Sequence, residues 1–292
     1  MTSLESRTSR KGWSVVAADG VDAIATATPL LDLLPRVWAA PDAASLGAAL
    51  PAGSEVQRWR RWRAAFLLPM GALGTVHVKV YRSRTVQRAI EALTPSRGPT
   101  SWRMGRAMRA AGLPTPEPLL LAVKKPLRIH LGSVLVTRPL VAPRLLTDEL
   151  KRRIAAGESV RPLLADVARL AAAFHEAGFL HGDFTASNVL LAGEPAARSL
   201  WLIDLDRTKR LGAMPPATRR WLQCLDLRLL LLTTWGEVSR RDWLRLLATY
   251  ARARKLPRAL RKRLAGRVLA ARRGRVRIGA TTGTIGGRDP WG

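Results

Sequence analysis

Hydrophobic and polar residues alternate in the first half of the chain with the period of two that a half-buried strand requires. The pattern predicts strands over residues 59–68 and 75–81, joined by a glycine-containing turn at residues 69–74. Two further apolar runs, residues 119–123 and 133–137, predict two more strands. The first half of the chain is therefore expected to be rich in β-structure.

The second half of the chain differs, because its apolar residues recur at the spacing of about 3.6 that an amphipathic helix requires. Helices are predicted over residues 147–156, 160–177, 216–234 and 241–254. One further helix is predicted in the first half, over residues 101–111, where Gly112 and Pro114 stop it. Two short apolar runs, residues 189–191 and 200–205, flank a Gly-Glu-Pro turn and predict a small hairpin. Strands followed by helices are typical of an α+β protein.

These elements predict a two-lobed α+β fold with a β-rich N-lobe and an α-helical C-lobe. The expected segments are residues 1–55 as an N-terminal extension with a short helix near residues 29–38, residues 56–140 as the N-lobe, residues 141–277 as the C-lobe, and residues 278–292 as a flexible tail. A proline-containing linker at residues 139–143 is expected to be the hinge between the lobes.

The bulk composition favours a cytoplasmic protein with a buried core. The chain has 292 residues, and 47% of them are apolar. We expect neither a membrane-spanning helix, which needs roughly 18–20 apolar residues, nor a signal peptide, because the first residues are polar and charged. Cys224 is the single cysteine, which excludes an intramolecular disulfide and a cysteine-based zinc site.

Charge is the compositional feature that bears on the partner. The chain has 49 lysines and arginines against 21 acidic residues, a net charge of +28. Such an excess favours a polyanionic partner, namely nucleotide phosphates, nucleic acid or an anionic membrane face. A GC-rich genome, which enriches a protein in alanine and arginine, explains the same excess without any partner. Charge alone therefore does not decide among these hypotheses.

One segment, LHGDFTASNVLL at residues 180–191, carries groups that phosphoryl transfer requires. Asp183 and Asn188 lie five positions apart in it, and Asp204 follows sixteen positions after Asn188, at the end of an apolar run. Phosphoryl transfer needs a carboxylate that orients and deprotonates the acceptor hydroxyl, and oxygen ligands for Mg²⁺. These three residues supply both kinds of group.

The spacing H-x-D-x-x-x-x-N, followed by an aspartate after an apolar strand, resembles the protein-kinase-like superfamily. The resemblance implies a protein-kinase-like fold that uses ATP and Mg²⁺. It implies that Asp183 is the catalytic base, that Asn188 and Asp204 bind metal, and that His181 holds the loop. Thr185 replaces the lysine common in the loop of Ser/Thr kinases, which argues against an ordinary protein kinase.

A lysine upstream matches the same superfamily. In residues 76–80 (VHVKV), strict alternation places His77 and Lys79 on one face of a strand and the valines on the other. Lys79 precedes Asp183 by 104 positions, where kinases have the lysine that binds the α- and β-phosphates. The resemblance therefore implies that Lys79 binds nucleotide near Asp204. His77 stands where kinases prefer a small residue over adenine.

Further residues resemble the lipopolysaccharide kinases, which phosphorylate Kdo or heptose in the inner core. In the segment LIDLDR, Asp206 is a second acid after Asp204 and is expected in a supporting role. The segments KVYR and GLPTP and a late helix with Trp221 and Asp226 also fit, so the similarity covers about residues 57–252. This resemblance implies an ATP- and Mg-dependent kinase that phosphorylates a sugar hydroxyl on an anionic, lipid-linked acceptor.

The chain also departs from the kinase pattern. It has no G-x-G-x-x-G motif, so Gly71 and Gly74 are the candidates for a phosphate-covering turn. Ser101 stands where the glutamate partner of the lysine is expected, and Glu91 and Glu117 are the nearest carboxylates on either side. Two alternatives therefore stay open. One is a RIO-like or aminoglycoside-type kinase with another acceptor, because the segment HGDFTASN also resembles the catalytic loop of those kinases. The other is a nucleotide-binding pseudokinase scaffold.

The stretch from Arg252 to Arg277 contains ten arginines, two lysines and no acid. Its leucines and valine lie near helical spacing, which predicts an amphipathic basic helix. Three interpretations compete. The stretch is a solvated face whose leucines join the core, or it binds an anionic inner-membrane surface, or, less favoured, it binds nucleic acid.

Overall fold

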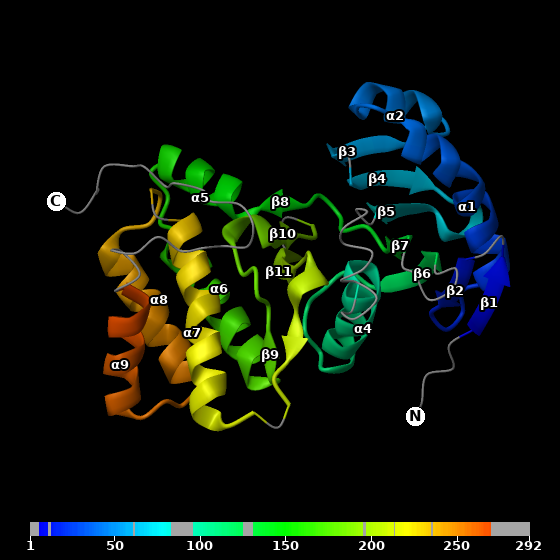
Figure 1. Cartoon of the computed structure of the whole chain (residues 1–292). Coiled ribbons are helices and arrows are strands. Elements are labelled where there is room, and N and C mark those ends of the chain that lie inside the picture. Colours follow the sequence, from blue (N-terminus) through cyan, green and yellow to red (C-terminus); the bar gives the residue numbers. More distant parts are fainter. Residues whose placement is uncertain are drawn as a thin grey trace. The chain divides into compact units, whose positions relative to one another are not determined.

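The computed structural model describes residues 6–10, 13–60, 62–82, 96–124, 131–194, 197–212, 214–234 and 236–269, with the backbone alone for residues 6–10. The chain divides into two compact units (Figure 1). Unit 1 comprises Met1–Val141 together with Asp204–Arg207, and unit 2 comprises Ala142–Ile203 together with Thr208–Gly292. Unit 1 is rich in strands and unit 2 is mainly helical, which confirms the predicted α+β class.

Unit 1 is built on a seven-stranded antiparallel sheet (Figure 1). Its strands are β1 (Ser6–Arg10), β2 (Trp13–Ala17), β3 (Glu55–Arg60), β4 (Arg63–Pro69), β5 (Thr75–Arg82), β6 (Pro118–Lys124) and β7 (Gly132–Thr137). They lie in the order β1-β2-β6-β7-β5-β4-β3. Lys79 on β5 pairs in register with Ala65 on β4 and Leu135 on β7. Because strands flank it on both sides, β5 is a rigid support for Lys79.

One side of this sheet packs on two helices, which supplies the core of unit 1. They are α1 (Ala23–Ala39) and α2 (Ala43–Ala49). The valines of β5 are buried in a cluster with Leu30 and Leu34 of α1. His77 and Lys79, on the opposite face of β5, are only half-buried. The alternation predicted for this strand is confirmed.

The N-terminal part differs from the extension predicted for residues 1–55, because β2, α1 and α2 are integral to unit 1. β2 pairs with β6 inside the sheet, and α1 is 17 residues long, well beyond the helix predicted near residues 29–38. The side chain of Asp22 begins α1 by accepting two backbone hydrogen bonds, at 2.8 and 2.9 Å. The helix continues through Pro29 and Pro35.

The single strand predicted over residues 59–68 is wrong, because this range covers the end of β3, a turn and most of β4. The two strands form an antiparallel hairpin in which Arg60 faces Arg63. The two residues between them are an arginine and a tryptophan, so none of the residues that usually mark a tight turn is present. The tertiary pairing decides the structure here.

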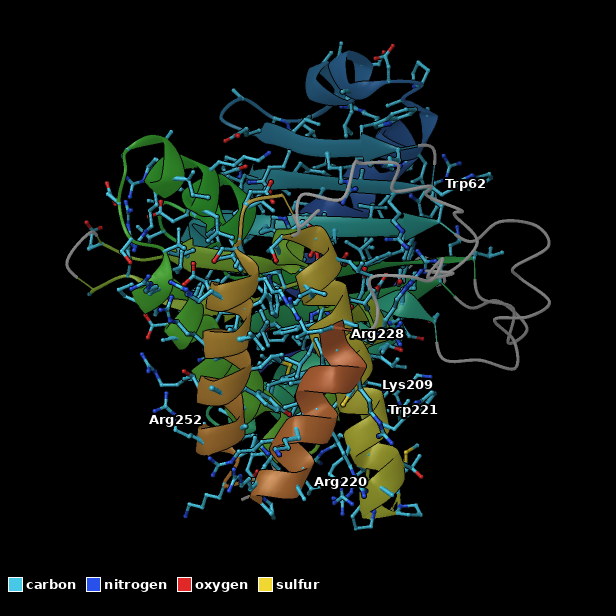
Figure 2. All side chains as sticks on the ribbon, turned by 90° about the vertical axis from the view of Figure 1, so that its left-hand side faces the viewer. Trp62, Lys209, Arg220, Trp221, Arg228 and Arg252 are labelled. Carbon is cyan, nitrogen blue, oxygen red and sulfur yellow. The ribbon has the colours of Figure 1, made fainter. Side chains whose placement is uncertain are left out.

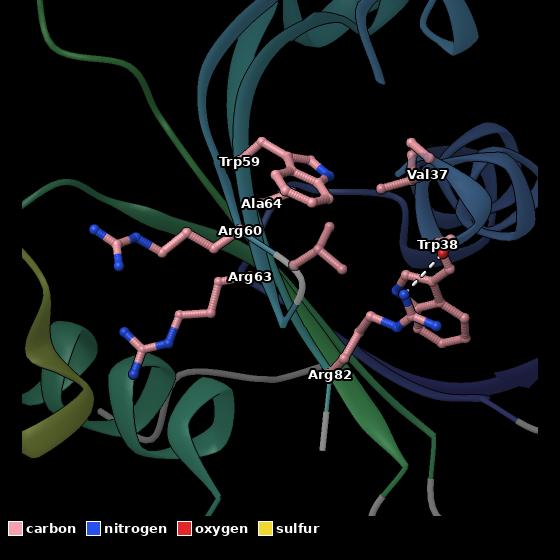
Figure 3. Close-up of a pocket in the computed structure, with 9 residues that line it drawn as sticks. Val37, Trp38, Trp59, Arg60, Arg63, Ala64 and Arg82 are labelled. Atoms are coloured by element: carbon pink, nitrogen blue, oxygen red, sulfur yellow. Dashed lines mark hydrogen bonds between the residues drawn. The ribbon is translucent and has the colours of Figure 1, made fainter. Parts of the chain in front are cut away.

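A small hollow lies beside this hairpin (Figure 3), where the guanidinium of Arg82 meets Trp38 of α1. Nη1 of Arg82 donates a hydrogen bond to the carbonyl oxygen of Trp38 at 2.7 Å, and the guanidinium carbon is 5.7 Å from the centre of the indole ring. The volume is about 10 Å³, which is room for about one water molecule. This hollow is therefore a packing feature and not a ligand site.

Helix α4 (Arg97–Ala110) supports the short segment that returns to unit 1. It packs on β6, β7 and the 3₁₀ turn η5 (Leu205–Arg207). Gly105 allows this approach, since a Cβ at that position would lie 2.8 Å from Cγ of Pro118 and 3.8 Å from Cδ1 of Leu205. The absence of a side chain at one helical position thus brings α4 close to the residues that follow Asp204.

Unit 2 contains five helices and two small sheets among its described residues. The helices are α5 (Leu146–Ala155), α6 (Arg161–Glu176), α7 (Pro216–Thr233), α8 (Arg240–Ala253) and α9 (Arg258–Leu269). The strands are β8 (Arg144–Leu145), β9 (Phe179–Leu180), β10 (Val189–Ala192), β11 (Ser199–Leu202) and β12 (Lys209–Arg210). β10 pairs with β11 and β8, and β12 pairs with β9. The predicted helices and hairpin of this half are confirmed.

The basic stretch from Arg252 to Arg277 is not one continuous helix. Its first part ends α8 and forms α9, and residues 270–277 lie outside the described part of the chain. Leu264 and Val268 of α9 are buried, and α9 packs on α7 and α8. Because these apolar residues belong to the interior of unit 2, α9 does not offer them to a bilayer.

Candidate active site

The loop after β9 carries the residues predicted to catalyse, and Asp226 of α7 holds its backbone. The carboxylate of Asp226 is almost fully buried and accepts hydrogen bonds from the N–H of His181 at 2.7 Å and of Gly182 at 2.9 Å. A carboxylate that receives two backbone N–H groups fixes the position and the direction of a loop. Gly182 has a φ of 72°, a conformation that glycine adopts without steric cost.

His181 ties this loop to the strand end that precedes Asp204 in the sequence. Its ring is fully buried, and Nε2 donates to the carbonyl oxygen of Ile203 at 3.1 Å. The ring also packs on Phe184, which stacks parallel to Phe174 of α6. These contacts give His181 a structural position beneath the loop.

Asn188 makes the contact that closes the loop. Its Nδ2 donates to the backbone carbonyl of Asp183 at 2.8 Å, and its side chain is buried within unit 2. Because the amide nitrogen is directed at the backbone, Oδ1 is the atom with which Asn188 can bind a cation. Asp183 itself is only half-buried, so its carboxylate stands at the surface of the loop.

In unit 1, Lys79 and Asp204 lie together. Nζ of Lys79 is 3.4 Å from Oδ1 of Asp204, which confirms the predicted proximity of the two side chains. They are 24% and 19% exposed, so both reach solvent. Asp204 has a φ of 60°, a left-handed conformation that only a small fraction of non-glycine residues adopt. Backbone strain of this kind is concentrated at functional sites.

Asp206 lies in a buried environment behind Asp204. Its side chain is only 3% exposed, and Oδ2 lies 3.4 Å from Arg63 of β4 and 3.8 Å from Arg97 of α4. Burial, and then the negative charge of Asp204, raise the pKa of Asp206. Two arginines from different elements therefore hold the second acid of the LIDLDR segment inside unit 1.

His77 lies two residues before Lys79 on β5 and is uncharged at neutral pH. Burial and the charge of Lys79 lower the pKa of His77 to about 4. Nδ1 of His77 is 3.5 Å from the hydroxyl of Thr137. Gly71 begins a 3₁₀ turn (η1, Gly71–Leu73) between β4 and β5 and Gly74 follows it, with φ of 50° and 67° and open space around both.

The glutamate partner expected for the lysine is absent from the described residues around Lys79. Ser101 is buried on α4, at the position where an acid is expected. Glu117 pairs instead with Arg138 at 2.7 Å. The alternative carboxylate, Glu91, lies outside the described residues. Asp204 is the carboxylate that the structure places beside Lys79.

Residues 72–250 match the lipopolysaccharide kinase (Kdo/WaaP) family, a segment that contains Lys79, the loop of Asp183 and Asn188, and Asp204. The chain belongs to this family. The membership confirms the resemblance that the LIDLDR and KVYR segments predict. It also favours the lipopolysaccharide-kinase hypothesis over the RIO-like and aminoglycoside-type alternatives.

Two curated relatives are 3-deoxy-D-manno-octulosonic acid kinases of Stenotrophomonas maltophilia. The protein of strain R551-3 is 32% identical over 155 residues, which cover 51% of this chain and 57% of the relative. The protein of strain K279a is 33% identical over 106 residues, which cover 36% and 39%. The matches thus span about half the length of these relatives or less. A solved structure, WaaP in complex with acyl carrier protein, is 25% identical to this chain and superposes with a TM-score of 0.51. The match covers 80% of this chain and 96% of that chain, and it confirms the kinase-like fold.

The metal-binding groups of this lipopolysaccharide kinase family member are few. The described residues contain no cluster of three or more His, Cys, Asp or Glu side chains that could hold a metal alone. Mg²⁺ in kinases is held by one or two protein oxygens together with phosphate oxygens and water, so a protein cage is not required. The oxygens of Asn188 and Asp204 are donors of the right chemistry.

Sequence reasoning missed the residues that position the site. Arg63 and Arg97 give no local signal, because their common partner Asp206 is more than 100 positions away. The sequence marks Asp226 only as part of a late helix that fits the lipopolysaccharide kinases, and not as the group that holds the loop. An acid within a leucine-rich run is costly to bury without partners, and this is the signal that could have drawn attention to it.

Proposed function

We propose that this chain transfers the γ-phosphoryl group of ATP to a hydroxyl of a Kdo sugar in lipopolysaccharide. Membership of the lipopolysaccharide kinase family supports the reaction class. The names of the two curated relatives support Kdo as the acceptor. The observation that carries the proposal is the loop of unit 2, where Asp226 and Asn188 fix the backbone on both sides of Asp183.

In this proposal Asp183 is the catalytic base. Its half-buried carboxylate accepts the proton of the acceptor hydroxyl as the phosphoryl group is transferred. A base of this kind contributes only if its position is fixed, and the hydrogen bonds around Gly182 and Asn188 provide that rigidity. His181 acts through the loop and not on the substrate.

Lys79 is proposed to bind the α- and β-phosphates of ATP, and the turn of Gly71 and Gly74 to cover them. Asn188 and Asp204 would hold Mg²⁺, which neutralises charge on the phosphates when bound. The ion pair of Lys79 with Asp204 supports this assignment, because it places the ammonium group beside the proposed metal ligand while both side chains still reach solvent. Asp206, held by Arg63 and Arg97, would have a supporting role by anchoring the turn that follows Asp204.

The acceptor is proposed to be lipid-linked, which would place the enzyme at the cytoplasmic face of the inner membrane. Among the described residues, none of the helices has the length and apolar character to cross a bilayer. Peripheral attachment is proposed through the basic stretch from Arg252 to Arg277 and anionic lipid. Nucleic acid is the less favoured partner of this surface.

The test measures transfer of radiolabelled γ-phosphate from ATP to a Kdo-containing lipopolysaccharide core acceptor. Asp183→Asn should lower turnover by about 10²–10⁴-fold, the usual contribution of a general base, and leave Mg-ATP binding intact. Asp204→Asn and Lys79→Met should weaken Mg-ATP binding as well as transfer. Asp166→Asn, an exposed aspartate of α6, is the matched control and should behave as wild type.

The same experiment decides between the kinase and a pseudokinase scaffold. A pseudokinase binds Mg-ATP but shows no transfer in the wild type, and its Asp183→Asn variant is indistinguishable from it. Transfer by the wild type to an aminoglycoside or a protein, but not to the Kdo acceptor, would overturn the proposed substrate while keeping the chemistry.

A further inference from the structure

Unit 2 contains a cavity of about 140 Å³ between α7, α8 and α9, lined in part by arginines of the basic stretch from Arg252 to Arg277. Four arginines line it: Arg220 of α7, Arg254 just after α8, and Arg263 and Arg267 of α9. Figure 2 shows α7, α8 and α9 from the side on which Arg220 lies. The described residues that line the cavity include no acid. Arg220, Arg263 and Arg267 are exposed and Arg254 is half-buried, and together they give the hollow a positive potential that favours an anion.

Arg254 gives a second, independent sign of a missing partner. Its side chain is 15% exposed, and its Nε faces Glu176 at 2.7 Å. Its Nη1, however, is buried and has no hydrogen-bond partner among the described residues. Leaving a buried charged donor unsatisfied costs more than leaving a neutral one, so such a group calls for an explanation. A ligand with acceptor oxygens in the cavity would satisfy it.

The cavity has an apolar side as well as a basic one. Leu256, Leu260 and Leu264 line it together with the arginines. Its size is similar to that of a cavity of ~150 Å³ that binds benzene in another protein. The space thus fits a small anionic group with a short organic part against the leucines, and it is too small for a folded macromolecule.

We propose that this cavity binds a phosphate-bearing ligand. Guanidinium groups bind phosphate through paired, charge-assisted hydrogen bonds, and several of them around one site favour a doubly charged tetrahedral anion over a single carboxylate. The phosphate could belong to a soluble metabolite or to the headgroup of an acidic lipid, and both present the same chemistry. Duplex nucleic acid would bind across the outer surface and would not need the interior of the cavity.

The cavity is connected to the catalytic loop by a chain of buried hydrogen bonds within unit 2. Tyr250, which lines the cavity, lies with its hydroxyl 2.9 Å from Nδ1 of His175. Nε2 of His175 is 3.3 Å from Oδ2 of Asp226, the oxygen that accepts the N–H of His181. Gln223, also in the lining, donates to the carbonyl of His175 at 2.9 Å. A ligand that orders Tyr250 should therefore stabilise the loop.

The binding test is calorimetric titration of the full chain with inorganic phosphate, pyrophosphate and glycerol 3-phosphate at about 50 mM salt, where exposed charges are only partly screened. The variant Arg263→Gln/Arg267→Gln should bind at least about tenfold more weakly, because it loses charge-assisted hydrogen bonds. The control Arg240→Gln/Arg241→Gln removes the same charge from exposed positions outside the cavity and outside the basic stretch, and it should bind as wild type. Equal losses in both double variants would mean a general charge effect and would overturn the site.

Cys224 offers a local readout, because it is the single cysteine and it lines the cavity. Its reaction with a thiol reagent should slow when glycerol 3-phosphate is bound, and it should not slow in Arg263→Gln/Arg267→Gln. Vesicles of phosphatidylglycerol, compared with phosphatidylcholine, test the lipid source. Protection of Cys224 by soluble phosphates alone identifies a metabolite, whereas protection by phosphatidylglycerol alone identifies a lipid. No protection by either overturns the proposal, as does protection by duplex DNA alone.

The link to the loop is tested by hydrogen exchange at the amides of His181 and Gly182, which does not depend on the proposed function. Saturating glycerol 3-phosphate should slow exchange there in the wild type. Tyr250→Phe keeps the ring but loses the hydrogen bond to His175, so it should keep ligand binding and lose the effect on exchange. Unchanged exchange in the saturated wild type would refute the connection between the cavity and the loop. Because no kinase assay is involved, failure here is separate from failure of the Kdo-kinase proposal.

Discussion

Replacing Asp226 by asparagine should be among the most damaging isosteric changes in unit 2. Each carboxylate oxygen accepts one backbone N–H of the catalytic loop, at 2.7 and 2.9 Å. In Asp226→Asn one oxygen becomes an NH₂ group, so a donor faces either His181 or Gly182. Loss of one charge-assisted hydrogen bond and the orphaned donor together cost about 2–4 kcal/mol. With about 2–4 °C for each kcal/mol in a domain of this size, the melting temperature should fall by roughly 4–16 °C.

The assay combines thermal unfolding with single-turnover phosphoryl transfer. Asp226→Asn should lower the rate of transfer, because the loop that carries Asp183 loses its support. It should affect Mg-ATP affinity less than transfer, because Lys79 and Asp204 are held by other residues in unit 1, and Asn188 is the one proposed metal ligand on the loop. Asp242→Asn is the matched control, since Asp242 makes partly exposed ion pairs and should cost less than about 1 kcal/mol. An Asp226→Asn variant that melts and turns over like the wild type would refute the reasoning.

Two further predictions concern packing and pH. Gly105→Ala should destabilise unit 1 by about 1–3 kcal/mol, because its Cβ would collide with Pro118. Gly47→Ala in α2 has room for a Cβ and should be neutral or stabilise the protein by up to about 1 kcal/mol. Urea unfolding of both variants measures the two effects. Hydrogen bonds from Arg152 and two further arginines hold the pKa of Glu149 well below its usual range, so its stabilising contribution is present above the unfolded pKa of about 4.3 and is lost as pH falls below it. Glu149→Gln should therefore lower the free energy of unfolding at pH 7 by roughly 2–4 kcal/mol, measured by urea unfolding. The difference from wild type should shrink toward pH 3.

The part of the site that is local in sequence could be predicted from sequence. Asp183 and Asn188 lie on one loop, and their spacing alone requires them to share it. The face on which Lys79 lies could be predicted because apolar and polar residues alternate strictly along β5. The burial of the β5 valines on the opposite face confirms it. In each case the information is contained within a few residues, so no tertiary knowledge is needed.

The supports of the site could not be predicted, because each joins residues that are distant in the chain. The contacts of Asp206 with Arg63 and Arg97 depend on how β4 and α4 meet the returning segment. The same applies to unit 1 near its N-terminus, where the role of residues 13–55 is decided by pairing of β2 with β6. A proline usually indicates a helix boundary, and α1 continues through two of them because its flanking turns are packed on the sheet.

The arginines that give the chain its positive charge fall into groups with different partners. Some arginines neutralise buried acids, as Arg63 and Arg97 do for Asp206, and these need no external partner. The arginines of the cavity between α7, α8 and α9 have no acid among the residues that line it with them, and the contact of Arg254 with Glu176 leaves Nη1 of Arg254 without a partner among the described residues. A genome rich in GC would add arginines wherever they are tolerated, on exposed surfaces, and it gives no reason for Nη1 of Arg254 to be buried without a partner. The hypothesis of a polyanionic ligand therefore applies most strongly to this one place on unit 2.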